Sequence, residues 1–297
     1  MSTLNARAVF VTRETDYELL INRHATIGQA RFFLKTRGQQ LSTLEDRHEH
    51  FSAVLKQARA AIPDDWRQTL VRRADLDRFL FAEDDLVIAI GQDGLVANVA
   101  KYLRGQNVVG VNPDPILYDG VLARHHVGEL AGRLEAIMAS DCEIERRTMV
   151  EGVLDNGQKL VALNELFVGH RSHQSARYQI VDGEQSENHS SSGLIVASGT
   201  GTTGWARSIM EATGQHLRLA PSDQALAYFV REPFPSVSTG TSLRSGKVHA
   251  KPLEVTSRMN DGGVIFADGM EQDFLSFDWG RSIAIGISAQ VLNLVLD

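Results

Sequence analysis

The stretch 85–100, DLVIAIGQDGLVANVA, decides the fold of the first part of this chain. Its apolar run at residues 86–90 is typical of a strand that is buried on both faces, as parallel strands are. A turn with two glycines follows at residues 91–94, and the segment 96–103 then predicts a helix. Open sheets of this kind bind ligands outside the carboxyl ends of their strands. The stretch therefore predicts a parallel sheet with a ligand site at the GQDG turn.

This turn contains the residue types that phosphate chemistry needs. Gly91 and Gly94 let the backbone approach a phosphate closely, and the start of the following helix offers N–H groups and a positive dipole end to an anion. Two chemical roles are open to Asp93, which can accept a proton from a substrate hydroxyl or help to hold Mg²⁺. The alternative is a tight turn in which Asp93 caps the helix. The turn alone does not decide among them.

The neighbouring segments extend the same pattern. Residues 7–12, RAVFVT, predict an opening strand. Apolar residues between Leu44 and Ala58 recur at helical spacing and predict a helix that ends before Pro63. NVVGVNPDP at 107–115 adds another strand and turn. Because alternating strands and helices build parallel sheets with covering helices, we expect an α/β domain at residues 1–120.

The pattern changes after about residue 141. Short segments rich in strand formers alternate with turn residues, which is typical of a layered antiparallel structure. Only ARSIMEATG (206–214) and SDQALAYFV (222–230) suggest helices there, and residues 282–296 predict buried strand and helix pieces. We therefore expect a mostly antiparallel β-sandwich domain at residues 121–297. In this arrangement roughly the last 20 residues pack back on the first domain.

Composition limits the partners of the chain. The 297 residues carry a net charge of −7, which argues against a broad nucleic-acid surface but permits a local anion site made of backbone N–H groups. Cys142 is the single cysteine, so no intramolecular disulfide forms. The N-terminal segment does not resemble a secretory signal, and no apolar stretch reaches the roughly 20 residues of a membrane span. We expect a cytoplasmic protein that binds neither nucleic acid nor membrane, and any nucleotide chemistry to be confined to a local site.

The loop GTGTTG at residues 199–204 has to be compared with two nucleotide-binding motifs. It matches the G-x-G-x-x-G pattern of dinucleotide-binding Rossmann units, with Asp223 as a candidate ribose-binding acid. However, Asp223 lies in APSDQALAY, which predicts a turn or a helix cap rather than a strand end. Trp205 and Ala206 stand where a P-loop needs Lys and Ser or Thr, which excludes that motif. A Rossmann dehydrogenase remains an alternative.

Five motifs, in the same order, resemble those of the NAD kinase family. IGQDGLVANVAKYL resembles the GGDGT turn of the family, and GVNPDP follows at 110–115. ALNELFVGH at 162–170 is similar to its asparagine-plus-acid motif, SSGLIVASGTGTTGWARSI at 191–209 to its Thr-Gly-rich loop, and ADGM at 267–270 to its late Asp-Gly turn. TRETDYELLINRH, LEDRHEHFSAVL and VNPDP look most like the mitochondrial-type NAD kinases of animals and their bacterial relatives.

The resemblance implies a two-domain kinase that transfers a phosphoryl group from ATP, or from another donor, to the adenosine 2′-hydroxyl of NAD. It gives Asp93 the role of catalytic base, and it implies that Gly91, Gly94 and Asn112 hold the donor phosphates together with Mg²⁺. It further implies a homodimer or homotetramer. The NAD-binding positions that it implies are Asn164, Glu165, Thr203, Trp205, Ser208 and Asp268.

Three residues depart from the family pattern. Gln92 replaces a glycine and Leu95 a threonine in the GGDGT turn, and Trp205 stands where the family usually has tyrosine. Gln92 adds a Cβ near the expected phosphate, and Leu95 removes a hydroxyl. We expect retained catalysis because Asp93 and Gly94 are present. A weakly active nucleotide-binding sensor is one alternative, and a kinase of the wider superfamily acting on a lipid or sugar is another.

Two charged clusters lie outside these motifs. His48-Glu49-His50 suggests a metal site, but residues two apart on a helix point in different directions, so we expect a solvated face and no metal ligands. Arg146 and Arg147 are neighbours on an expected strand. Since adjacent strand residues point to opposite faces, at most one of the two reaches a phosphate.

Overall fold

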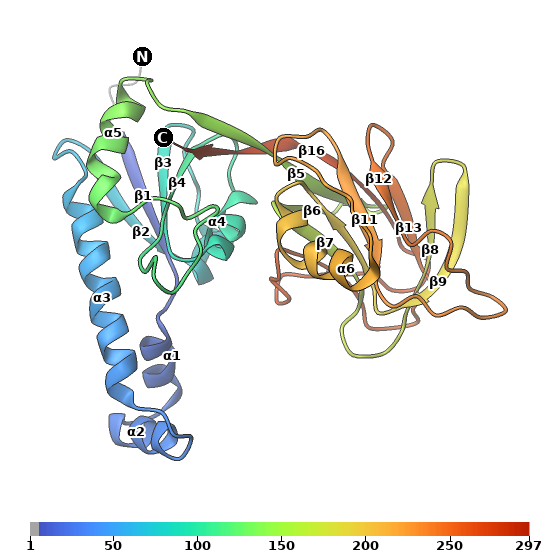
Figure 1. Cartoon of the computed structure of the whole chain (residues 1–297), viewed down its shortest axis with the longest axis horizontal. Coiled ribbons are helices and arrows are strands. Elements are labelled where there is room, and N and C mark those ends of the chain that lie inside the picture. Colours follow the sequence, from blue (N-terminus) through green and yellow to red (C-terminus); the bar gives the residue numbers. More distant parts are fainter. Residues whose placement is uncertain (1–5, 297) are drawn as a thin grey trace. The chain divides into compact units, whose positions relative to one another are not determined.

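The computed structural model describes residues 6–296 of the chain. They form two compact units, which are described one at a time (Figure 1). The first unit holds the chain up to Tyr102, the segment Gln106–Ile144 and the chain from Leu294 on. The second unit holds Leu103–Gly105 and Glu145–Asn293.

A parallel sheet forms the centre of the first unit. Its strands are β1 (Arg7–Thr12), β2 (Arg67–Arg72), β3 (Asp85–Ile90) and β4 (Asn107–Val111), in the order β2-β1-β3-β4. Each neighbouring pair among them is parallel, and every residue of β3 is buried, as in a central parallel strand. The end of β16 (Ser282–Val295) lies beside β4. The predicted parallel sheet is confirmed.

Helices cover both faces of this sheet (Figure 1). α3 (Leu41–Ala60) and α5 (Leu130–Met138) share one apolar core with alternate strand residues such as Phe10 and Ile88. α4 (Asp93–Ala100) packs against β1, β3 and β4 and is buried from Leu95 onward. The predicted helix before Pro63 is therefore confirmed. The helix expected at 96–103 begins earlier, at Asp93, because the GQDG turn enters the helix directly after Gln92.

Two short helices that the sequence did not predict pack beside the first half of α3. α1 (Asp16–Arg23) begins at a capping box: the Thr15 hydroxyl accepts the N–H of Glu18, and the Glu18 carboxylate accepts the N–H of Thr15. α2 (Ile27–Lys35) follows it. The buried residues of the small apolar cluster that joins these helices to α3 are Leu20, Ala30, Leu34 and Leu41.

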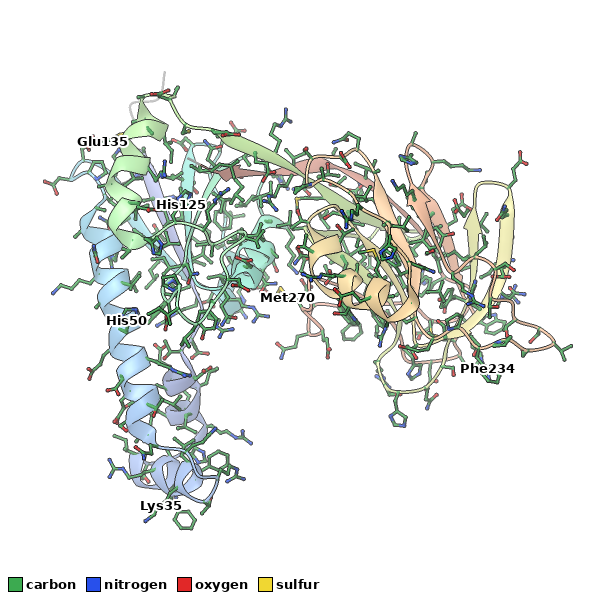
Figure 2. The ribbon with its side chains drawn as sticks, viewed as in Figure 1. Lys35, His50, His125, Glu135, Phe234 and Met270 are labelled. Carbon is green, nitrogen blue, oxygen red and sulfur yellow. The ribbon has the colours of Figure 1, made fainter. Side chains whose placement is uncertain are left out.

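The first unit continues past residue 120, where the sequence suggested a boundary. The His125 ring nitrogen Nε2 lies 3.0 Å from the carbonyl oxygen of Val295, and His125 is buried (Figure 2). The short 3₁₀ turn η2 (Val127–Glu129) then leads into α5, whose Leu130 and Leu134 enter the core of the sheet. A second 3₁₀ turn, η1 (Arg73–Arg78), follows β2. The compact unit includes α5 because these contacts bury its apolar face.

The second unit contains a six-stranded sheet that is antiparallel throughout. Its order is β12-β11-β10-β7-β14-β15. α6 (Trp205–Thr213), predicted from the sequence, follows β10 through the 3₁₀ turn η3 (Gly201–Thr203). The strands are β7 (Glu165–His170), β10 (Leu194–Ala197), β11 (Leu226–Val230), β12 (Ser245–Val248), β14 (Gly263–Ala267) and β15 (Leu275–Ser276).

The other strands of the second unit pair antiparallel as well, β13 with β16 and β8, β8 with β9, and β5 with β6. Their bounds, besides those of β16, are β5 (Ile144–Leu154), β6 (Lys159–Ala162), β8 (Ala176–Asp182), β9 (Gln185–Ser191) and β13 (Leu253–Ser257).

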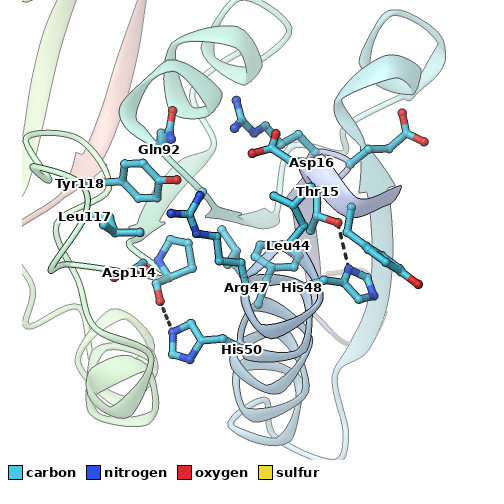
Figure 3. Close-up of a pocket in the computed structure, with 17 residues that line it drawn as sticks. Thr15, Asp16, Leu44, Arg47, His48, His50, Gln92, Asp114, Leu117 and Tyr118 are labelled. Carbon is cyan, nitrogen blue, oxygen red and sulfur yellow. Dashed lines mark hydrogen bonds between the residues drawn. The ribbon is translucent and has the colours of Figure 1, made fainter. Parts of the chain in front are cut away.

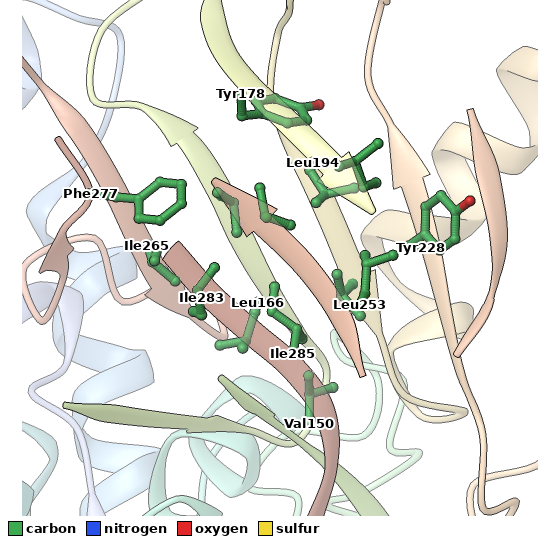
Figure 4. Close-up of a cluster of buried hydrophobic side chains, with 14 of the residues drawn as sticks. Val150, Leu166, Tyr178, Leu194, Tyr228, Leu253, Ile265, Phe277, Ile283 and Ile285 are labelled. Atoms are coloured by element: carbon green, nitrogen blue, oxygen red, sulfur yellow. The ribbon is translucent and has the colours of Figure 1, made fainter. Parts of the chain in front are cut away.

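One apolar core joins the two sheets of the second unit (Figure 4). Tyr178 and Ile283 come from one sheet, and Leu166, Leu194 and Ile265 come from the other. All of these side chains are buried, so the core is a closed layer between two sheets. The predicted β-sandwich is confirmed.

Two helix predictions in this unit were wrong. SDQALAYFV contains the strand β11, which is buried at every residue because it lies between β10 and β12. Residues 282–296 contain one long strand, β16, instead of strand and helix pieces, and the buried Ile283 and Ile285 alternate on it with partly exposed residues. Within residues 6–296, no helix has the length and apolar character to cross a membrane.

Candidate nucleotide-binding site

The GQDG turn lies at the carboxyl end of β3, as predicted. The N–H of Gly91 donates to the carbonyl of Val111, 3.0 Å away at the end of β4. A Cβ on Gly91 would lie 2.9 Å from Cδ2 of Leu95, which is buried. Leu95, the residue that departs from the family threonine, therefore packs back under the turn. Here it acts as an apolar support, which the sequence pattern did not reveal.

Asp93 is bonded to a loop that lies far from it in the sequence. Its Oδ1 accepts the N–H groups of Leu122 and Ala123 at 2.9 and 2.8 Å, and its Oδ2 accepts that of Val121 at 3.0 Å. It does not cap α4, since the N-cap residue is Gln92 and makes no side-chain cap bond. The capping alternative is thus wrong. A carboxylate has about four acceptor positions, so three bonds leave about one position open, on Oδ2.

Asn112 organises the loop after β4. It is buried, its Nδ2 donates to the carbonyl of Tyr118 at 2.9 Å, and its Oδ1 accepts the N–H of Asp114 at 3.0 Å. Its backbone N–H donates to the carbonyl of His125. Asn112 therefore shapes the edge of the sheet next to the GQDG turn.

A cavity opens at this edge, where β1, β3 and β4 end (Figure 3). Gly91 and Gln92 line it together with His48 and His50 of α3. Nδ1 of His48 lies 2.9 Å from Oγ1 of Thr15, and Nε2 of His50 lies 2.8 Å from the carbonyl oxygen of Pro113. α3 passes beside the ends of the strands, so both histidines line the pocket and contact residues on its other side. The expectation of a purely solvated helix face therefore does not describe His48 and His50. Across residues 6–296, no three His, Cys, Asp or Glu side chains lie close enough to hold a metal.

In the second unit, Asp268 fixes the turn that carries Asn164 and Glu165. Its Oδ2 accepts the N–H of Leu163 at 2.9 Å, and its Oδ1 accepts those of Asn164 at 2.7 Å and Glu165 at 3.2 Å. Asp268 has a φ of +49°, a left-handed conformation that aspartate tolerates better than most residues. The late Asp-Gly turn and the asparagine-plus-acid motif thus form one structure.

Glu165 is a buried acid without a partner in the described part of the chain. Only 8% of its surface is exposed, and its side chain makes no hydrogen bond or ion pair with residues 6–296. Burial, and secondarily the negative charge of Asp268, raise the pKa of Glu165 to about 8. The carboxyl group is therefore protonated at neutral pH and can donate a hydrogen bond.

The Thr-Gly loop at 199–204 packs directly on this turn. The N–H of Ser198 donates to the carbonyl of Asn164 at 2.9 Å, and a Cβ on Gly201 would lie 2.0 Å from that same oxygen. Only glycine fits there. The loop follows an antiparallel strand, and Asp223 closes a turn by accepting the N–H of Ala220 at 2.8 Å. The Rossmann alternative is therefore wrong, since it needs a parallel βαβ unit.

The remaining predicted NAD-binding residues lie at the end of the loop and in α6. The ring of Trp205 stacks on Phe167 with centroids 5.8 Å apart, and the guanidinium carbon of Arg231 lies 5.0 Å from the centroid of Trp205. Thr203, at the end of η3, and Ser208, in the first turn of α6, are both exposed, and the Thr203 hydroxyl donates to the carbonyl of Thr200. Arg231 was not predicted from the sequence, because it lies in no recognisable motif.

Of the two adjacent arginines on β5, one is buried and one is exposed, as the strand pattern predicted. Arg147 is 5% exposed, pairs with Glu145 at 2.7 Å and donates to Oγ1 of Thr200 at 3.3 Å. Arg146 is exposed. Arg147 therefore supports the Thr-Gly loop from below.

Comparison with known proteins points to one family. The chain is 33% identical over 192 residues to an NAD kinase of Nitratidesulfovibrio vulgaris, covering 60% of this chain and 61% of that protein. It is 27% identical over 168 residues to an NAD kinase of Cytophaga hutchinsonii, covering 54% of each. The matches thus span about half to three fifths of these relatives. No protein-family model matches the chain.

Solved structures match nearly the whole chain. An NAD kinase from Archaeoglobus fulgidus in complex with ATP has a TM-score of 0.60 at 19% identity, covering 98% of this chain and 93% of that one. A yeast NADH kinase complexed with NADH has a TM-score of 0.60 at 14% identity, covering 99% of this chain and 84% of that one. The chain therefore has the two-domain fold of these NAD kinases.

Proposed function

We propose that this protein is an NAD kinase, which transfers a phosphoryl group from ATP, or from another donor, to the adenosine 2′-hydroxyl of NAD and forms NADP. The observation that carries the proposal is the convergence of three separate motifs in the second unit. The loop 199–204 and Asp268 both contact the turn at Asn164 and Glu165. The carboxyl group of Glu165 is buried and has no partner among residues 6–296. An unpartnered buried polar group of this kind is typical of a ligand site.

In this proposal the second unit binds NAD. The protonated Glu165 donates a hydrogen bond to a ribose hydroxyl, and Asn164 both donates and accepts. Trp205 offers an apolar ring that can stack on a base, and the exposed hydroxyls of Thr203 and Ser208 complete the polar contacts.

Asp93 is the proposed base. Its remaining acceptor position on Oδ2 would take the proton of the attacking hydroxyl, while its bonds to the loop 121–123 fix its orientation. Such transfers depend mainly on positioning and on charge stabilisation. Gly91, Gly94 and Asn112 would shape the site for the donor phosphates.

Mg²⁺ fits this arrangement as a companion of the donor. The described residues provide carboxylate oxygens near the GQDG turn but no cluster that holds a metal alone, and Mg²⁺ is usually bound through one or two carboxylates and the substrate phosphates. When bound, it neutralises charge that develops on the transferred group.

The test is an assay for NADP formed by the purified protein from NAD, ATP and Mg²⁺, with NADH as a second acceptor. We expect turnover that requires all three components. Tight NAD binding without NADP formation would identify the protein as a sensor instead. Phosphorylation of a lipid or sugar, with none of NAD or NADH, would assign it to another kinase of the superfamily.

Three further properties belong to this proposal. We propose a cytoplasmic location, a homodimeric or homotetrameric assembly, and closest kinship with the mitochondrial-type NAD kinases of animals and their bacterial relatives. The N-terminal segments TRETDYELLINRH and LEDRHEHFSAVL support the kinship.

A further inference from the structure

The orientation of Asp93 depends on a short segment of chain, residues 121–125, which we call the strap. The N–H groups of its first three residues bond to the two carboxylate oxygens of Asp93. The torsion that turns an aspartate carboxylate is soft, so the side chain itself does not fix the direction of its oxygens. Three donors on both oxygens do fix it. The position of the strap therefore decides where the acceptor position that stays open on Oδ2 points.

Backbone contacts hold the strap against β4. His125 donates its N–H to the carbonyl of Gly110 at 3.0 Å, and its own carbonyl accepts the N–H of Asn112 at 2.9 Å. These two bonds form one parallel bridge between His125 and Val111. Gly110 has no room for a Cβ, because the carbonyl oxygen of Leu122 occupies that space. The strap thus lies in direct contact with one strand of the sheet.

The ring of His125 joins the strap to a second strand. Its Nε2 lies 3.0 Å from the carbonyl oxygen of Val295, the last residue of β16. A carbonyl oxygen can only accept, so Nε2 carries the hydrogen and donates it. This end of β16 is itself fixed, since it lies beside β4 and the N–H of Leu296 donates to the carbonyl of Glu143 at 2.8 Å. The ring bond therefore attaches the strap to a fixed part of the sheet.

The surroundings of His125 make this bond important in the folded state. The residue is only 2% exposed, and burial lowers the pKa of its ring, as do the charges of Arg133 and Arg124. The bond to Val295 and the charge of Glu129 act in the opposite direction. A buried polar ring is costly unless its hydrogen bond is made. An apolar side chain would fill the same space without that cost, so the specific contribution of histidine is the donor on Nε2.

We propose that His125 is a positioning residue for the phosphoryl transfer. It does not touch the substrates, but it anchors the strap whose N–H groups orient Asp93 toward the attacking hydroxyl. The proposal rests on the proposed function, in which Asp93 is the base. It adds to that function a residue that lies outside the five motifs.

Loss of the ring bond should slow the reaction without weakening substrate binding. A strap that is free on one side lets the Asp93 carboxylate turn away from its productive direction. We expect kcat for NADP formation to fall about tenfold to a hundredfold, because a misplacement of about 1 Å can have an effect of this size. The KM values for NAD and ATP should stay unchanged, since His125 neither lines the cavity at the GQDG turn nor belongs to the second unit.

Two amide variants of the full chain form a matched pair. The amide nitrogen of glutamine reaches about as far from the backbone as Nε2 of histidine, whereas that of asparagine reaches only as far as Nδ1. His125→Asn should therefore lose the bond to Val295, and His125→Gln should restore most of the kcat that His125→Asn loses. Val54→Ala is the control for destabilisation alone, because Val54 is buried in the core of the same unit on α3.

Thermal unfolding midpoints check that each variant is folded at the temperature of the assay. If His125→Asn does not fold, His125→Leu takes its place, since leucine also lacks the donor but suits a buried position.

Hydrogen–deuterium exchange of the strap gives a second readout that does not need turnover. The N–H groups of Val121, Leu122 and Ala123 are protected while they bond to Asp93. Mass spectrometry of peptides that span these residues should show exchange about tenfold faster or more in His125→Asn than in the wild type. In His125→Gln the exchange should return toward the wild-type rate.

A lower kcat with unchanged KM values and faster strap exchange in His125→Asn, both recovered in His125→Gln, supports the proposal. Wild-type kcat in His125→Asn overturns it, and so does unchanged exchange of the strap. Equal losses of kcat in His125→Asn and His125→Gln, or in His125→Asn and Val54→Ala, overturn it as well, because they indicate a structural role only.

Failure of this proposal differs from failure of the proposed function. If the wild type forms NADP and His125→Asn keeps its kcat, the role of His125 is wrong while the function stands. If the wild type forms no NADP, the function is wrong and the catalytic role of His125 falls with it. The exchange rates then still decide whether His125 anchors the strap.

Discussion

Replacing Glu165 by glutamine removes a buried carboxylic acid whose pKa is raised by burial to about 8. The wild-type carboxyl keeps its proton in the folded protein up to about pH 8, whereas in the unfolded chain it ionises near 4.5. Between these two values the unfolded state binds fewer protons than the folded state. The free energy of unfolding therefore falls as the pH rises through this window, and it is independent of Glu165 below and above it.

The size of the effect follows from the two pKa values. A separation from 4.5 to about 8 corresponds to about 5 kcal/mol, at about 1.4 kcal/mol per unit of pKa. Between pH 5.5 and pH 8 the contribution is on the order of 3 kcal/mol. Glutamine at position 165 is neutral at every pH, so Glu165→Gln should gain about this much stability relative to the wild type as the pH rises across that range.

Denaturant unfolding at a series of pH values, followed by circular dichroism, measures this difference. Glu254→Gln is the matched control, because Glu254 is an exposed glutamate on β13 of the same unit and its loss should leave the wild-type pH dependence unchanged. A constant stability difference between Glu165→Gln and the wild type, from pH 5.5 to pH 8, would refute the reasoning.

The same proton should control ligand binding. If Glu165 donates a hydrogen bond to a ribose hydroxyl, NAD affinity should fall as the pH rises past about 8 in the wild type. In Glu165→Gln the amide still donates, so the affinity should stay constant across the same range. Calorimetric titration with NAD at pH 6.5 and pH 9 distinguishes the two, and an equal loss in both proteins would contradict the donor role.

Two further predictions concern single positions of the site. Asp93→Asn should lower the rate of NADP formation by about a hundredfold or more, with NAD affinity unchanged, and full activity would remove Asp93 as the base. Because its amide group would face an N–H of the loop 121–123, the unfolding free energy should also fall by about 1–3 kcal/mol, which chemical denaturation detects. Gly201→Ala should lower stability by about 1–3 kcal/mol and weaken NAD binding, because its Cβ would lie 2.0 Å from the carbonyl oxygen of Asn164. Its control, Gly132→Ala in the open first turn of α5, should raise stability by up to about 1 kcal/mol; equal effects of the two would contradict the close packing of the loop.

Local sequence was sufficient for the elements whose pattern is unambiguous. The apolar run of β3, bounded by a charged residue and a glycine turn, has the length of a strand and is too short for a buried helix. The periodic apolar residues of α3 and the stop signal at Pro63 located that helix. The strand β3 and the helix α3 both follow from short-range sterics and hydrogen bonding, which depend on residues that are close together in the sequence.

Where the apolar pattern of a segment is compatible with both a helix and a strand, contacts with neighbouring elements decide which of the two forms. The run at β11 is short, apolar and preceded by cap-like residues, so it is compatible with a helix until β10 and β12 supply hydrogen bonds on both edges. α1 and α2 are too short to be stable alone, and they exist because their apolar side chains pack on α3.

The sequence by itself determined which residue types are present for phosphoryl transfer and the order of the motifs that contain them. Only the tertiary structure decided which hydrogen bonds those residues make and which of them are buried. Asp93 holds N–H groups 28 to 30 positions away, and Asp268 holds a turn more than 100 positions away, which no local pattern predicts. The protonation state of Glu165 likewise depends on burial by distant strands. The free-energy cost of ionising a carboxyl group is set by the protein that surrounds it and not by its sequence neighbours.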